Sequence, residues 1–275
     1  MQYRVLVADN CVVATVENIM LQHILPIARY TLLEALRNRL FWLGLILVAA
    51  GLILTQFLQQ VALTESNQIQ TALLAAVLRV GAVFMLAGFV ITSMVREFND
   101  KVMELILSRP LERSSYFFGK LAGYASIALA LALIASLPLA LFAPARQVAL
   151  WGLSLACELL IVTSFALFCV LSLTQVMSAL AAVAGFYLLS RSVSALQIMA
   201  ANPLSDVQSL GQQLVNFIID AIAFFLPGLD RMTQTGWLIY GTPTSAEILG
   251  VLAQTAVYVL LLCGAALFDL QRKNF

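Results

Sequence analysis

Residues 149–173 read ALWGLSLACELLIVTSFALFCVLSL, an apolar run that contains one charged side chain, Glu158. An α-helix needs about 20 predominantly apolar residues to cross the hydrocarbon core of a bilayer, so this run is long enough to span one. Five more stretches share its length and character. The six expected spans lie at about 40–58, 72–95, 121–143, 149–173, 177–198 and 246–268. The sequence therefore predicts an all-α polytopic membrane protein.

The composition of the whole chain agrees with this prediction. Of the 275 residues, 62% are hydrophobic and 11% are charged, and the mean hydropathy is +0.96. A soluble domain has about 45–50% apolar and about 25% charged residues. These values exclude an ordinary soluble enzyme, a disordered chain and a nucleic-acid-binding protein, and the net charge of +1 offers no field to attract nucleic acid.

The distribution of lysine and arginine predicts the orientation. Eleven of them fall before the first span, between the second and third spans, or after the last span, whereas only Arg146 and Arg231 fall in the loops on the other side. Positive residues in short loops favour the cytoplasmic side. We therefore expect a multi-pass protein of the cytoplasmic (inner) membrane with both termini in the cytoplasm.

The longest connection, residues 199–245, contains an apolar stretch at Leu214–Leu229 that Asp220 interrupts. It is short for a span, and a seventh crossing would place Arg272 and Lys273 outside. We expect a re-entrant or interfacial helix on the outer face that ends near Pro227-Gly228.

Residues 24–39 form an amphipathic pattern that follows an N-terminal extension at 1–23. Leu25, Ala28, Leu32 and Leu36 recur at helical spacing opposite arginines. This predicts an interfacial helix at the start of a single transmembrane domain, residues 24–275. The alternative is a basic flank that only fixes the topology.

The loop after the second span predicts a short amphipathic helix at 97–107. Glu97 and Lys101 form an i,i+4 pair of favourable order, and Pro110 ends the helix. Its apolar stripe (Phe98, Val102, Leu105, Ile106) favours an element that docks on a cytoplasmic partner. The alternative is a solvated connector.

Residues 97–120, EFNDKVMELILSRPLERSSYFFGK, resemble the loop between the second and third spans of ABC-transporter permeases of the type-2 exporter class. The start PIARYTLLEALRNRLFW (26–42) and the tail FDLQRKNF (268–275) are similar to the interface helix and the basic end of that class. FFLPGLDRM (224–232) and GWLIYG (236–241) are similar to the outer region of permeases for multi-copper-enzyme maturation, including the one serving nitrous oxide reductase. The matching loop positions are Glu97, Lys101, Glu104, Leu107, Pro110, Arg113, Tyr116, Gly119 and Lys120.

This resemblance implies a permease subunit that exports or repositions a substrate. It would act with a second permease, either an identical copy or a related chain, and with two cytoplasmic ATPase subunits. The implied partner-docking residues are Glu97, Lys101, Glu104, Pro110 and Arg113. Gly119-Lys120 is not a phosphate loop, because Ser114 and Leu121 stand where GxxxxGK[ST] needs Gly and Ser/Thr. We therefore expect no enzyme activity and no cofactor in this chain, with ATP and Mg²⁺ on the partner ATPase.

Three charged residues, Arg79, Glu158 and Arg191, fall inside expected spans at similar depths. A charge in the hydrocarbon costs about 2.5–3.5 kcal/mol on insertion scales, so each needs a partner or a wet cavity. They either line a translocation path or form a structural salt bridge, or Arg79 extends to the outer surface. One histidine and four scattered cysteines predict no metal site.

Two further functions also fit the sequence. An ion-coupled carrier needs intramembrane carboxylates, of which Glu158 is the clearest. A membrane anchor of a peripheral complex would share the docking loop, and transport with and without ATP distinguishes it from a permease.

Overall fold

The computed structural model describes residues 24–61, 66–100, 113–201 and 210–272, and every regular element in these ranges is helical. Six of the helices are long and apolar enough to cross a membrane. They are α2 (Leu40–Val61), α3 (Ser66–Asn99), α5 (Arg113–Ser136), α6 (Ala145–Leu173), α7 (Val176–Ala201) and α10 (Ser245–Arg272). The predictions of an all-α fold and of six candidate spans are thereby confirmed, and the chain is a multi-pass membrane protein.

Local signals set several helix ends. Pro144 precedes the first residue of α6 in an extended conformation. Thr244 and Glu247 form a reciprocal capping box at the start of α10, because each side chain bonds the backbone N–H of the other. A short 3₁₀ turn, η1 (Leu137–Leu141), follows α5 and contains Pro138.

The helices at the loop between the second and third spans are longer than predicted. α3 continues to Asn99 rather than ending near residue 95, and α5 begins at Arg113 rather than near 121. An α-helix continues through polar residues when tertiary contacts stabilise them, and hydropathy alone does not detect this. Glu97, Arg113 and Lys120 therefore lie on the two long helices. Residues 101–112 lie outside the described ranges, as does the extension at 1–23.

α6 is the central helix of the bundle. It contacts α3, α5, α7 and α10, and 78% of its apolar window is buried, compared with 22% for α2 and α10. Trp151 on α6 is fully buried. Large apolar side chains such as Trp42, Ile53 and Leu260 are exposed on the outer helices, as expected for surfaces that face lipid.

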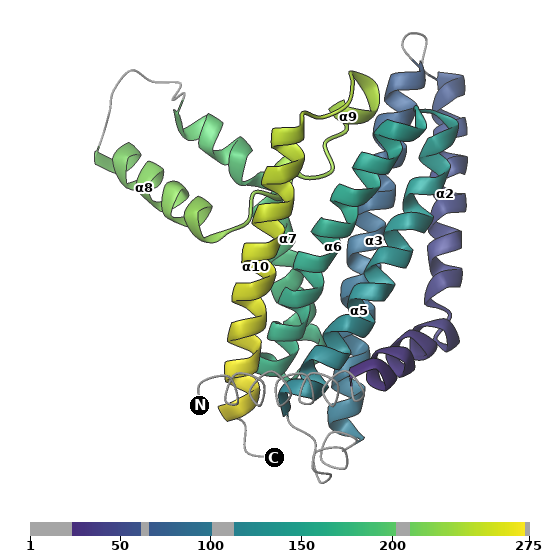
Figure 1. Ribbon diagram of the computed structural model, residues 1–275. Helices are drawn as coiled ribbons and strands as arrows, with labels where there is room; N and C mark the ends of the chain where they lie inside the picture. The colour runs from purple at the N-terminus through teal and green to yellow at the C-terminus, as the bar shows by residue number, and fades with distance from the viewer. Residues whose placement is uncertain (1–23, 62–65, 101–112, 202–209, 273–275) are drawn as a thin grey trace, which may run out of the picture.

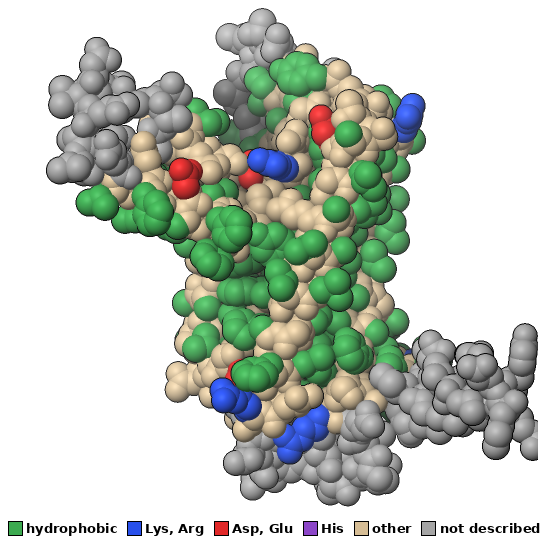
Figure 2. Space-filling model, turned by 60° about the vertical axis from the view of Figure 1, so that its left-hand side comes forward, with side chains coloured by type: hydrophobic (Ala, Val, Ile, Leu, Met, Phe, Trp, Pro, Cys, Tyr) green, Lys and Arg blue, Asp and Glu red, His purple; other side chains and the backbone are tan. Residues whose placement is uncertain are grey.

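The two ends of the bundle differ in charge. We call the end that holds Arg96, Arg113 and Arg272 the basic end; the helix at residues 24–37 and the last turn of α10 also lie there (Figure 1). Arg146 and Arg231 lie at or toward the opposite end. In Figure 2, lysine and arginine side chains occupy the two ends of the visible face, and the surface between them is mostly hydrophobic.

The helix at residues 24–37 lies across the basic end and turns sharply into α2 (Figure 1). The turn is made at Asn38 and Arg39, and Arg39 has a left-handed φ of 57°. The helix thus exists close to the predicted bounds of 24–39.

The connection between α7 and α10 contains α8 (Leu210–Phe225), η2 (Leu229–Arg231) and α9 (Gly236–Ile239). α8 packs along α7 and stands to one side of the bundle (Figure 1). It has 16 residues and ends just before Pro227, which agrees with the predicted short apolar helix.

Cysteine accessibility tests this arrangement. In a Cys11→Ser background, a cysteine at Arg37 and one at Arg272 should react with an impermeant maleimide from the same side of sealed vesicles, and one at Arg146 from the other side. The three described native cysteines, Cys157, Cys169 and Cys263, are buried and should react weakly. Labelling of the Arg146 and Arg272 positions from the same side would contradict six spans.

Candidate functional site

Two glycines on α5 form a seat for the helix at residues 24–37. A Cβ added to Gly119 would lie 2.9 Å from the Cβ of Ile27, and one added to Gly123 would lie 2.7 Å from the Cβ of Thr31. Real Cβ atoms do not approach that closely, so only glycine permits this contact. Because both pairs have i,i+4 spacing, two successive turns of each helix pack together, as small-xxx-small patterns allow.

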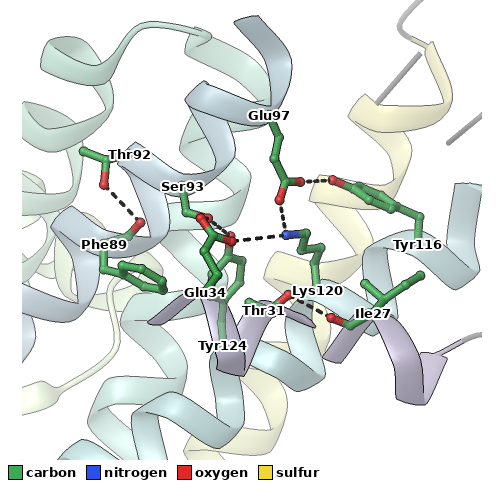
Figure 3. A network of polar contacts seen from close by, with 10 residues as sticks. All are labelled: Ile27, Thr31, Glu34, Phe89, Thr92, Ser93, Glu97, Tyr116, Lys120 and Tyr124. Carbon is green, nitrogen blue, oxygen red and sulfur yellow. Dashed lines mark hydrogen bonds and ion pairs between the residues drawn. The ribbon is translucent and has the colours of Figure 1, made fainter. Parts of the chain in front are cut away.

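Beside this seat, polar side chains from three segments converge (Figure 3). We call them the junction network: Glu34 from the helix at 24–37, Ser93 and Glu97 from α3, and Tyr116, Lys120 and Tyr124 from α5. The Lys120 ammonium donates to Glu97 and lies 4.0 Å from Glu34.

Hydroxyl groups complete the junction network. Ser93 donates to Glu34 at 2.8 Å, and Tyr124 donates to the Ser93 oxygen at 3.1 Å. Tyr116 donates to Glu97. Each carboxylate therefore accepts both a hydroxyl hydrogen bond and an ionic contact from Lys120.

The junction network joins the two ends of the connection at 100–112. The Lys120 side chain is only 7% exposed, so removal of either carboxylate would leave a charge poorly solvated. Arg113, the first residue of α5, donates to the carbonyls of Leu270 and Gln271 at 3.3 Å each. The base of α5 is thus bonded to the helix at 24–37, to α3 and to the last turn of α10.

Two of the five predicted docking residues, Glu97 and Arg113, lie within the described residues, and each contacts another helix of the bundle. Glu97 points into the junction network, toward Lys120 rather than toward a protein surface, and Arg113 lies against the end of α10. Lys101, Glu104 and Pro110 lie outside the described residues. Glu97 therefore contributes to the contact between α3 and α5.

The second polar group lies between α3, α6 and α7. Arg79 and Glu158 each lie 13 residues after the first residue of their helices, which is about 20 Å along the axis at about 1.5 Å per residue. Glu158 is fully buried, and Arg191 Nη1 lies 3.7 Å from its Oε1. The three intramembrane charges are thus brought to one region, which we call the intramembrane cluster together with Thr233.

Thr233 is the residue around which the intramembrane cluster is arranged. Its backbone N–H donates to Ser154 Oγ at 2.9 Å, and its hydroxyl donates to Glu158 at 2.6 Å. Its carbonyl accepts from Arg79 at 3.1 Å. Thr233 is fully buried and has a positive φ of 48°, an uncommon conformation for a β-branched residue. These bonds hold it there.

The remaining contacts of the intramembrane cluster fix the chain on either side of Thr233. Arg191 Nη1 lies 2.7 Å from the carbonyl oxygen of Leu229 and 3.1 Å from that of Met232. Both arginines therefore bind backbone carbonyls of residues 229–233, which fold into the bundle from the opposite end. This geometry favours a structural salt bridge over a translocation path, because the cluster holds residues 229–233 against α3, α6 and α7.

Sequence reasoning missed Thr233 and Ser154, since neither has a local signal and the contact depends on how 229–233 folds back. The sequence does contain a signal for the junction network, because its residues recur at helical spacing. Tyr116, Lys120 and Tyr124 are spaced i, i+4, i+8 on one face of α5, and Ser93 and Glu97 are spaced i, i+4 on α3.

Within the described ranges, no group of three or more histidine, cysteine or acidic residues could hold a metal ion. The sequence matches no protein-family model, and it matches no curated protein. The structure shows a multi-pass all-α membrane protein with a charged junction at its basic end.

The glycine seat makes a prediction for stability. Gly123→Ala should lower the free energy of unfolding by about 1–3 kcal/mol, because the added methyl group overpacks against Thr31. Gly88→Ala on α3 is the matched control, since a Cβ there meets nothing within 4 Å. Unfolding by denaturant in detergent measures both. Equal stability of the two variants would contradict the seat.

The intramembrane cluster also makes a prediction for stability. Glu158→Leu should destabilise the protein by about 3–5 kcal/mol, since it leaves Arg191 partly buried without a counter-ion. Arg191→Leu combined with Glu158→Leu should recover part of that loss, because the unpaired charge is then also removed. A double variant as unstable as the sum of the two single variants would show that the residues do not interact.

Proposed function

We propose that this chain is the permease subunit of an ATP-driven transporter of the ABC type-2 exporter class. It would move or reposition a substrate across the cytoplasmic membrane, with a separate ATPase bound at the basic end. The observation that carries the proposal is the junction network. It connects both ends of the 100–112 connection to the helix at 24–37, at the end of the bundle to which the proposal assigns the ATPase.

The mechanism follows from these contacts. ATP binding closes the partner ATPase dimer and displaces the connection at 100–112. α3 and α5 begin or end at that connection, and α5 carries the helix at 24–37 through the Gly119 and Gly123 seat. The displacement is thus applied to two spans and the interfacial helix together, and the spans rearrange to pass the substrate.

The docking and transmitting roles are separated in this proposal. Lys101, Glu104 and Pro110 of the connection are assigned to partner contact, together with Arg113 at its end. Glu97 is assigned to transmission, because its carboxylate is bound by Lys120 and Tyr116. A second permease copy completes the translocation path. Six candidate spans, the basic end and the resemblance at 97–120 support this assignment.

An ion-coupled carrier fits the geometry less well. Such a carrier needs a carboxylate that exchanges protons or ions with water during each cycle. Glu158 is fully buried and is held by the Thr233 hydroxyl and Arg191. Breaking the contacts of Glu158 would also release the segment at 229–233, so we assign Glu158 a structural role.

The proposal predicts two different defects. Glu104→Lys should reduce co-purification of the ATPase in mild detergent by at least about tenfold. The new lysine would meet the basic group of the ATPase that Glu104 is proposed to contact, and like charges at a contact cost several kcal/mol. Glu97→Gln keeps the shape of the side chain but removes the ionic contact with Lys120. It should retain the ATPase while the ATP-driven transport rate in vesicles falls. Arg146→Glu is the control, since it reverses an exposed charge toward the opposite end.

Three results would overturn the proposal. The first is that no nucleotide-hydrolysing protein co-purifies with the unaltered chain. The second is that Glu104→Lys retains its ATPase as well as Arg146→Glu does. The third is that a bound ATPase hydrolyses ATP but drives no transport in sealed vesicles, which would favour a membrane anchor.

A further inference from the structure

A polar cavity of about 580 Å³ lies between the hairpin of α7 and α8 on one side and α10 on the other. Its polar lining residues come from four segments of the chain. They are Ser194 and Gln197 on α7, Asp220 on α8, Arg231 in η2, and Gln254 and Tyr258 on α10. Pockets for small ligands have volumes of about 300–1,000 Å³, so the cavity is of the right size for one.

The cavity lies beside the first half of α10, a helix long and apolar enough to cross a membrane. Gln254 is nine residues after Ser245, the first residue of α10, which places it about 14 Å along the helix at about 1.5 Å per residue. Around it, α10 exposes Leu249, Val257 and Leu260, as a lipid-facing helix does. A polar cavity beside such a surface is costly unless water or a polar ligand fills it.

The walls carry charges of both signs that do not pair with each other. Asp220 accepts a hydrogen bond from Gln197 at 3.4 Å. Neither Asp220 nor Arg231 forms an ion pair with any described residue. Asp230 follows the cavity-lining Gly228 by two residues. Its Oδ2 accepts a hydrogen bond from the Ser194 hydroxyl, and its Oδ1 has no hydrogen-bond partner among the described residues. In Figure 2, acidic and basic side chains gather near the top of this face, above the hydrophobic surface.

The rim of the cavity is apolar. Phe224, which is 82% exposed, lines it beside Leu226. Further exposed aromatic side chains of α8 are Phe217 and Phe225. A ligand that fits this site therefore has a positive and a negative group in its head and an apolar tail that lies along α8 and α10.

We propose that this lateral cavity binds a phospholipid with a zwitterionic headgroup, of which phosphatidylethanolamine is the probe. The ammonium group faces Asp220, the phosphate faces Arg231, and the acyl chains lie on the exposed surfaces of α8 and α10. As a statement about the transported substrate, this rests on the proposed permease function. As a statement about binding, it stands on the cavity alone.

Gly250 gives a way to block the cavity without disturbing the fold. It lines the cavity, and a Cβ added there meets no atom within 4 Å. Gly264 on the same helix has equally open surroundings but does not line the cavity. Gly250→Leu should thus fill the site, and Gly264→Leu is a matched control.

Native mass spectrometry of the delipidated chain, without an ATPase, measures lipid binding. Phosphatidylethanolamine should bind at least about tenfold more tightly than phosphatidylglycerol, which has no ammonium group. Gly250→Leu should weaken phosphatidylethanolamine binding at least about tenfold, and Gly264→Leu should leave it unchanged. Asp220→Asn should reduce the preference between the two lipids, because it removes the partner of the ammonium group. Arg231→Gln should weaken the binding of both lipids, because both carry the phosphate group.

Equal affinity for the two lipids, or unaltered binding by Gly250→Leu, would overturn the proposal. Free phosphoethanolamine that binds as tightly as the lipid would also overturn it in favour of a soluble zwitterion. Because these measurements use the chain alone, their failure would leave the proposed association with an ATPase intact. If the chain binds lipid normally but no ATPase co-purifies with it, the permease function is contradicted instead.

Discussion

The constraint on which the rest of the structure depends is that a bilayer cannot solvate charges or backbone polar groups. The protein therefore has to satisfy its own polar atoms. Arg79, Glu158 and Arg191 do so by binding Thr233 and the carbonyls beside it. Lys120 does so between Glu34 and Glu97. At the lateral cavity, Asp220 and Arg231 form no ion pair with a described residue, and this contrast is the reason for assigning a ligand there rather than in the intramembrane cluster.

The two ends of the molecule have complementary roles in this account. At the basic end, the glycine seat and the junction network join the helix at 24–37 to α3 and α5, and in the proposed mechanism these elements move together. Farther along the bundle, the intramembrane cluster holds residues 229–233 inside it and thereby positions η2, whose Arg231 lines the cavity. α6 contacts four of the other spans and connects the two regions. A displacement at one end can therefore reach the other through packed helices.

The sequence predicts much of the fold because the bilayer imposes a length and an apolar composition on each span. All six expected spans correspond to helices, and the short helix before Pro227 was expected as well. Contacts between distant segments were harder to predict. The local i,i+4 spacing predicts a pair of Glu97 and Lys101, and Lys101 lies outside the described residues. The contact of Glu97 with Lys120 depends instead on the packing of α3 on α5. The spacing of Gly119 and Gly123 permits close helix packing, but it does not identify Ile27 and Thr31 as the residues that pack there. Thr233 gave no signal, since its position depends on the course of the whole segment after α8.

The central claim is that a nucleotide bound by a partner changes the basic end of this chain. Hydrogen–deuterium exchange of the complex purified in mild detergent, with and without ATP and vanadate, tests it most directly. The account predicts altered exchange in residues 24–37, in the last turn of α3 and in the first turn of α5, with the middle of α6 unchanged. Identical exchange in those three segments with and without nucleotide would contradict it.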